Sequence, residues 1–264
     1  MQLEVSAVSR AMSRKTGETG GPMPIYVISL DRSVERFSSF LQRNAHLGDS
    51  TRARAVDGAC LDRNDLLARG VLSREVGYTN ASLGCAVSHA CLWQIASAMD
   101  GPMTIAEDDA LFRHDFRASS HALIATLPSD WDFVLWGWNF NSLLCIDLLP
   151  GIASGVLLCD QDAIRQNVMR FQQTDLPLTA HRLLRSHGCI CYSVSPEGAK
   201  RLLELCLPIR DLNVWFPVAN VMTPNDGIDM MMSLAYPEMK AFVSVPPLVV
   251  TENRPETSTI QGQG

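Results

Sequence analysis

The chain has 264 residues, of which 47% are hydrophobic and 19% are charged, and its formal net charge is −6. This composition is typical of a globular protein with a sizeable core, and the lack of a Lys/Arg-rich block argues against nucleic acid as the main partner. No apolar run in the sequence reaches the roughly 18 to 20 residues that a membrane-spanning helix requires.

Residues 1–22 are rich in Ser, Gly, Thr and charge, and we expect a disordered extension there, followed by one domain over residues 23–264. The eight cysteines form no CxxC pair, and in a chain without a recognisable export signal we expect them to be reduced thiols. The closest pair is Cys189-x-Cys191, which strand alternation would place on one face. The expected location is the cytoplasm, with peripheral contact at the inner membrane left open.

Strands and helices alternate along the chain. A continuous apolar run at residues 25–30 predicts a strand buried on both faces, and Asp31 or Ser33 can cap the helix that follows it. The other predicted strands cover residues 55–56, 103–106, 132–136, 189–194 and 243–250. Further helices are predicted over residues 82–99 and from Ser195-Pro196 onward, whereas residues 139–187 are assigned to loops and helices over the active face. The alternation predicts an α/β fold with a mostly parallel central sheet.

The strand at residues 103–106 runs directly into Glu107, Asp108 and Asp109. In open α/β sheets ligands bind at the carboxyl ends of the strands. Adjacent carboxylates repel one another unless a cation neutralises them, and Mg²⁺ or Mn²⁺ is commonly held by one or two carboxylates together with substrate phosphates. The triplet is therefore a candidate metal site. A solvated acidic turn is the alternative, and the triplet alone does not decide between the two.

Two common phosphate-binding motifs are missing from the sequence. It contains no GxxxxGK[ST], and no GxGxxG follows the first strand, which disfavours P-loop NTPases and dinucleotide-binding dehydrogenases. Arg32 instead lies at the turn after that strand, where it can meet a phosphate or a base together with helix amides. A surface ion pair with Glu35 is the alternative role for this arginine.

Five short blocks together resemble glycosyltransferase family 25, the bacterial lipopolysaccharide and lipooligosaccharide glycosyltransferases related to collagen galactosyltransferases. Residues 28–36, ISLDRSVER, resemble the family's opening V-I-N-L-D-R-x-x-x-R, with Ser29 in place of the usual Asn. The other blocks follow in the family's order: AVDG at 55–58, LGCAVSHACLW at 83–93, IAEDDA at 105–110 and YSVSPEGAK at 192–200. Each block is weak alone, but five in order are specific.

The resemblance implies a GT-A-like, Rossmann-type sheet flanked by helices. It further implies a UDP-sugar donor, with galactose or another hexose, a divalent metal, and inverting transfer to a saccharide or glycolipid acceptor of a surface glycan such as lipopolysaccharide. Carried over by position, the donor-binding candidates are Arg32, Ser88, His89, Glu107 and Asp108, and the metal candidates are Glu107 and Asp109. The family's P-V-D element has no clear counterpart here. We favour Asp229, with Asp226 and Asp211 as rivals.

Inverting transfer needs a general base for the acceptor hydroxyl, and Asp229 is the candidate, with Asp226 second. A helix cap is the alternative role of Asp229. His187 is considered as a further metal ligand, and Trp138, at a strand end, as an aromatic face for a sugar ring. A buried structural role is the alternative for His89 and for Trp138.

Two other functions use the same residues. The first is a metal-dependent phosphohydrolase or nucleotidyltransferase, which would not need the sugar moiety. The second is a non-catalytic sugar-nucleotide-binding protein of the same fold, which would bind donor without turnover.

Overall fold

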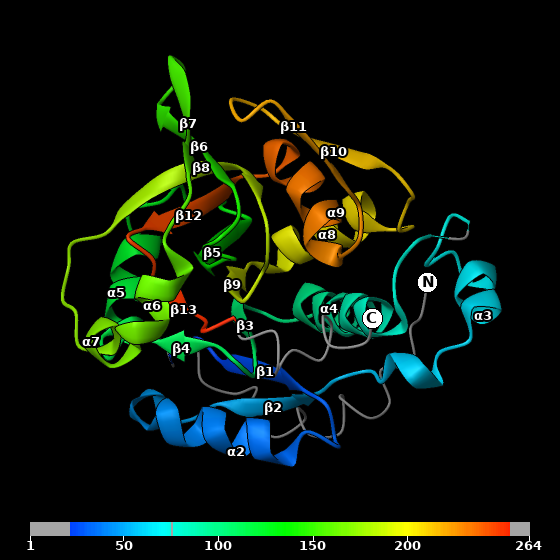
Figure 1. The fold of residues 1–264 in the computed structure, drawn as a ribbon, viewed down its shortest axis with the longest axis horizontal. Helices are drawn as coiled ribbons and strands as arrows, with labels where there is room; N and C mark the ends of the chain where they lie inside the picture. The colour runs from blue at the N-terminus through cyan, green and yellow to red at the C-terminus, as the bar shows by residue number, and fades with distance from the viewer. Residues whose placement is uncertain (1–21, 75, 254–264) are drawn as a thin grey trace.

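The computed structural model describes residues 22–74 and 76–253 (Figure 1). The predicted disordered extension falls almost entirely on residues 1–21, outside these ranges. The strands are β1 (Ile25–Ser29), β2 (Thr51–Arg54), β3 (Met103–Glu107), β4 (Leu111–Phe112), β5 (Phe133–Gly137), β6 (Leu144–Leu149), β7 (Ala153–Leu157), β8 (Thr179–Ser186), β9 (Cys191–Val194), β10 (Asn213–Phe216), β11 (Val221–Pro224), β12 (Ala241–Val245) and β13 (Val249–Val250). The helices are α2 (Val34–Arg43), α3 (Arg63–Ala68), α4 (Asn80–Ser97), α5 (Phe116–Ile124), α6 (Gln161–Gln166), α7 (Val168–Gln172), α8 (Pro196–Cys206) and α9 (Ile228–Ala235).

A nine-stranded sheet in the order β2-β1-β3-β9-β5-β12-β8-β6-β7 forms the centre of the molecule. β1 pairs in parallel with β2 and β3, and β5 pairs in parallel with β12, whereas the other neighbours are antiparallel. The predicted α/β fold is therefore confirmed, but the pairing is more mixed than the mostly parallel sheet that was predicted. The reason is that β9 lies between β3 and β5 in the opposite direction, and that β6, β7 and β8 extend the sheet as antiparallel neighbours.

The prediction for residues 139–187 missed these three strands. β6 and β7 form the outer edge of the sheet, and apolar side chains are exposed at their outer end, among them Leu149 of β6 at 52% and Ile152 in the turn between the strands at 85%. A strand without a buried face at its outer end shows no regular alternation of apolar and polar residues, so the pattern did not reveal it. β6 and β7 project beyond the rest of the molecule, close to the β10–β11 hairpin (Figure 1).

Several predicted boundaries are corrected. The strand predicted at residues 55–56 lies instead at β2, a four-residue strand at the other edge of the sheet in which only Ala53 is buried. The strand predicted at residues 243–250 is two strands, β12 and β13, because prolines interrupt it. Cys189 precedes β9, and it packs in a different hydrophobic cluster from Cys191, so the two thiols do not share a face.

The core lies on both faces of the sheet. Side chains of α4, α8 and α9 pack on one face, around Tyr192 and Phe133, and α2 and α5 pack on the other, around Trp136. α4 is buried over most of its surface, and its Thr79 hydroxyl caps the helix by accepting from the Ser82 amide. Within the described residues, no helix is both long enough and apolar enough to cross a membrane.

Candidate active site

Three acidic residues stand where the carboxyl end of β3 lies beside that of β1. In the parallel register of these strands Ile28 is opposite Glu107. Asp108 accepts hydrogen bonds from Ser29 Oγ at 2.8 Å and from Arg36, whose Nε lies at 2.9 Å and Nη2 at 2.5 Å. Protein groups thus neutralise Asp108, which is only 9% exposed. The two flanking acids remain as candidates for holding a cation.

Asp109 has one paired and one unpaired carboxylate oxygen. Oδ2 accepts a 3.1 Å hydrogen bond from Thr251 Oγ1, whereas Oδ1 is buried and has no hydrogen-bond partner among the described residues. Burial and the charge of Asp108 raise the pKa of Asp109, and they outweigh the opposing charge of Arg36. A buried carboxylate oxygen without a donor is unfavourable unless a cation meets it. This orphaned oxygen fits a divalent cation at Asp109.

Glu107 is the second oxygen donor. Burial raises its pKa to about 8, and the negative charges of Asp109 and Asp108 add to this effect against the opposing charge of Arg36. Two carboxylates in such a position match the donor preference of Mg²⁺ or Mn²⁺, which leave the remaining coordination positions to water and phosphate oxygens.

His89 lies behind Glu107 and is fully buried. Its Nδ1 is 2.8 Å from the Tyr192 hydroxyl, which also accepts a 2.7 Å hydrogen bond from Trp93 Nε1. Its Nε2 lies 3.9 Å from Glu107 Oε1. Burial lowers the pKa of His89 to about 4, so its imidazole is neutral at pH 7. His89 thus lies on the core side of Glu107, Asp108 and Asp109, which we call the acidic corner. Because its side chain is fully buried, a donor cannot reach it from the surface.

A cavity of about 430 Å³ lies at the carboxyl ends of β1 and β2, and none of Glu107, Asp108 and Asp109 is among the residues that line it. Arg32, Asp57 and Ser88 are among the residues that line it. Arg32 is half exposed and pairs with Asp57, so the alternative pairing with Glu35 is not formed. Ser88 is held by the protein, since its hydroxyl donates to Gly84 O and accepts from the Val56 amide. The volume is within the range of small-molecule sites.

Asp229 lies in the first turn of α9, and its Oδ2 accepts a 2.7 Å hydrogen bond from the Gly188 amide. Burial raises the pKa of Asp229, although this hydrogen bond and His187 oppose the shift. Its negative charge contributes to the raised pKa of Glu107, so the two carboxyls lie within electrostatic range. The rivals are placed differently. Asp226 is exposed, and Asp211 is 62% exposed and pairs with Arg74.

The two remaining predicted residues, His187 and Trp138, each pack against an aromatic side chain. His187 stacks on Phe216 at 4.3 Å between ring centroids, and its Nδ1 is 3.4 Å from Leu143 O. It is close enough to Asp229 to lower the pKa of that carboxyl. Trp138 is 1% exposed and packs against Phe140 at 4.5 Å, so it is a core residue and offers no open face to a sugar.

Sequence reasoning missed two residues that hold the acids in place. Arg36 is the last residue of the first family block, and the i, i+4 spacing from Arg32 was the available signal. Thr251 had no signal, because its approach to Asp109 depends on the pairing of β13 with β4.

Comparison with known proteins identifies the family of the chain. The family model described as glycosyltransferase family 25 (LPS biosynthesis protein) matches residues 23–222, which is most of the chain. A search of curated proteins gave no match. The matched segment includes all five sequence blocks, the three acids Glu107, Asp108 and Asp109, and the residues that line the cavity. The chain belongs to glycosyltransferase family 25, and the nine-stranded α/β architecture is the GT-A-like fold of a glycosyltransferase of lipopolysaccharide biosynthesis.

Proposed function

We propose that the protein transfers a hexose, with galactose as the first candidate, from a UDP-sugar to a saccharide or glycolipid acceptor of a surface glycan, with inversion at the anomeric carbon. The observation that carries this proposal is the buried Asp109 Oδ1, which lacks a partner among the described residues. A cavity of suitable size lies at the ends of β1 and β2, and β1 is the neighbour of β3 in the sheet. Asp109 and Glu107 would hold Mn²⁺ or Mg²⁺, which when bound stabilises the charge on the departing diphosphate.

The cavity, Arg32 and Asp108 have different roles in donor binding. The cavity at the ends of β1 and β2 would receive the nucleoside, with Arg32 at its wall available to a phosphate or a base. Asp108 is already paired with Arg36 and Ser29, so its role is to fix the turn that presents its two neighbours. This preorganisation keeps the acids in place before the donor binds.

Asp229 is the proposed general base. Its carboxylate would accept the proton of the acceptor hydroxyl while that oxygen attacks the anomeric carbon from the side opposite the leaving UDP. The raised pKa of Asp229 makes it a stronger base than an exposed aspartate. The Gly188 amide donates to Oδ2 of Asp229 and so fixes the orientation of the carboxylate.

A thermal-shift screen of UDP-, GDP- and CMP-sugars, each with and without Mn²⁺, tests the donor class. We expect UDP-sugars to stabilise the protein most, and only with the cation present. The Asp109→Asn variant should lose this cation-dependent shift and transfer activity while it remains folded by circular dichroism. Full activity in this variant would refute the proposed metal site. Stabilisation by UDP alone, with no sugar transferred to any acceptor, would instead identify a non-catalytic binding protein, and hydrolysis that ignores the sugar would identify a phosphohydrolase.

A further inference from the structure

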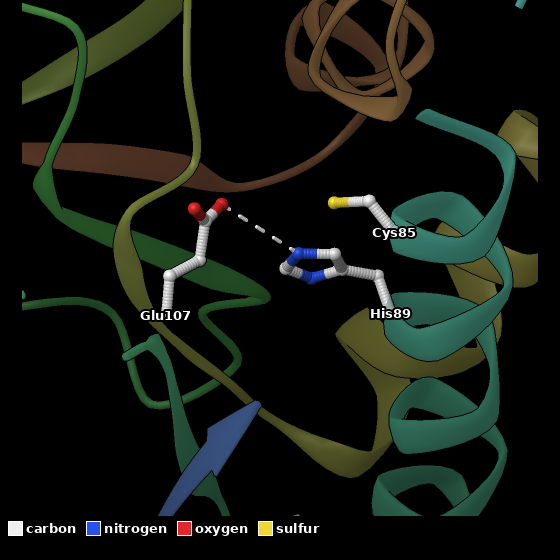
Figure 2. Close-up of side chains that lie close together, drawn as sticks. All are labelled: Cys85, His89 and Glu107. Carbon is white, nitrogen blue, oxygen red and sulfur yellow. Dashed lines mark ion pairs between the residues drawn. The ribbon is translucent and has the colours of Figure 1, made fainter. Parts of the chain in front are cut away.

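A second group of ligand atoms lies on the core side of the acidic corner. Among the described residues, Cys85, His89 and Glu107 place a thiol, an imidazole nitrogen and a carboxylate oxygen within 4.8 Å of one another. Figure 2 shows that Cys85 and His89 project from adjacent turns of α4 toward the Glu107 carboxylate at the end of β3. Their i, i+4 spacing is what places both side chains on one side of the helix.

Cys189 adds a fourth ligand atom to this group. Its Sγ is 3.8 Å from His89 Nε2 and 4.0 Å from Glu107 Oε1, and the latter two atoms are 3.9 Å apart. The three atoms thus form a nearly equilateral triangle. A point equidistant from all three lies about 2.3 Å from each, which is close to the usual zinc–sulfur distance and slightly beyond the zinc–nitrogen and zinc–oxygen distances.

The surroundings orient His89 for this role. Its Nδ1 is engaged by the Tyr192 hydroxyl, so Nε2 is the nitrogen that faces the thiols and the carboxylate. Trp93 Nε1 fixes that hydroxyl in turn. A ligating histidine is usually held in this way through its other ring nitrogen.

We propose that Cys85, His89, Glu107 and Cys189 form a site for a thiophilic divalent cation of the Zn²⁺ class. It shares only Glu107 with the oxygen site at Asp109, because Oε1 is the Glu107 oxygen that lies near His89 and Cys189. Sulfur and imidazole donors select Zn²⁺ over Mg²⁺ and Mn²⁺, whereas Asp109 offers only oxygen. Cys85 Sγ lies within 4.8 Å of the His89 and Glu107 ligand atoms and would complete the set of four by moving toward the ion. The bound cation would join α4, the end of β3 and the segment before β9, and would fix the carboxylate of Glu107.

Cobalt substitution tests this site directly. Reduced, chelator-treated full-length protein is titrated with Co²⁺, because thiolate ligation gives a near-ultraviolet charge-transfer band and intense tetrahedral ligand-field bands that an oxygen-only site does not give. We expect one equivalent of Co²⁺ with these bands, displaced by one equivalent of Zn²⁺. Absence of the bands in the unmodified protein would overturn the proposal without any need for variants.

Variants locate the ion. Cys85→Ala and Cys189→Ala should each weaken Co²⁺ binding by about tenfold or more and reduce the thiolate band. Cys60→Ala removes an exposed thiol and Cys145→Ala a buried one outside the cluster, and neither should change the titration. Loss of the band in Cys60→Ala, or an unchanged band in both cluster variants, would refute the assignment.

The test is independent of the transferase proposal. Asp109→Asn should keep the cobalt bands while it loses the donor-dependent thermal shift. A protein that transfers sugar but shows no bands would refute only the thiolate site. One that shows the bands but transfers no sugar would refute only the proposed function.

Discussion

The guanidinium of Arg36 donates two hydrogen bonds to Oδ1 of Asp108, from Nε at 2.9 Å and from Nη2 at 2.5 Å. The contact crosses from α2 to the loop after β3 and so joins the first family block to the acidic block. The pair is mostly buried, with Arg36 at 26% and Asp108 at 9% exposure. The positive charge of Arg36 therefore neutralises Asp108, the middle acid of the triplet. Glu107 and Asp109 on either side are the acids that a metal ion would use.

Replacing Arg36 tests whether this pairing positions the site. We expect Arg36→Gln to lower kcat/KM by about 10- to 100-fold and to destabilise the protein by about 2 kcal/mol, less than a fully buried pair because the arginine is partly exposed. Steady-state kinetics and urea unfolding measure the two effects. Arg69→Gln breaks an exposed i, i+4 pair with Asp65 and serves as the control, with a change below about 0.5 kcal/mol. Equal effects of the two substitutions would contradict the positioning role.

Asp229→Asn tests the general base. We expect kcat to fall by about 10²- to 10⁴-fold while donor binding is retained, because the proton acceptor is lost and the fold is not. Asp226→Asn and Asp211→Asn, both at exposed positions, should stay near the unmodified rate. A larger loss in either of these would transfer the role to that residue.

The pH dependence of the unmodified enzyme gives a second check on Asp229. A base acts only when deprotonated, and burial raises the pKa of this carboxyl above its ordinary value. Activity should therefore fall with decreasing pH at a higher pH than the ordinary aspartate pKa of 3.8 would give. A kcat/KM profile that stays flat down to pH 4 would rule out this base.

A structural ion pair outside the site gives a stability prediction. Arg113 is 1% exposed and binds Asp115 through Nε at 2.9 Å and Nη2 at 2.7 Å. Asp115→Asn leaves this guanidinium without its counterion, so we expect a loss of about 3 kcal/mol at pH 7 in urea unfolding. Asp162→Asn breaks an exposed pair with Arg165 and should cost below about 0.5 kcal/mol.

The same ion pair predicts how the loss changes with pH. Burial raises the pKa of Asp115, but the hydrogen bonds from Arg113 and Ser119 outweigh it and leave the pKa below its ordinary value. A carboxyl with a lowered folded pKa contributes stability above its unfolded pKa, and this contribution disappears as pH falls through the folded value. The difference between Asp115→Asn and the unmodified protein should therefore shrink below about pH 4. A difference that grows on acidification would contradict the assigned direction.

Gly84 is the point at which the family block at residues 83–93 packs against the block at residues 55–58. A Cβ at this position would lie 2.6 Å from Val56 O and 2.6 Å from Gly58 N, both of which are backbone atoms. In an open helix, Gly→Ala adds about 1 kcal/mol of stability. Here the substitution should instead destabilise the protein by about 1 to 3 kcal/mol, because the loop carrying Asp57 must move. Gly77→Ala, with no atom within 4 Å of the added Cβ, is the matched control for thermal unfolding.

The parts of the fold that could be predicted from the sequence are those with a continuous buried pattern. β1, β3, β5 and α4 follow such patterns and were located within a few residues. The hairpin of β6 and β7 could not be found, because only the first half of β6 is buried and the apolar residues Leu148 and Leu149 at its other end are exposed. The acidic corner was located by its place after β3, but Thr251 and Cys189 reach it only through strand pairings between distant segments, which local periodicity does not encode.

The short pairing of β13 with β4 has a consequence for biosynthesis. Val249 and Val250 pair with Phe112 and Leu111, and this contact brings Thr251 to Asp109. A ribosome has made more than 100 further residues after Asp109 before it adds the threonine that completes this corner. The nascent chain therefore cannot present a finished site to nucleotide sugars during translation, and catalytic competence should appear only after its last segments have emerged and docked.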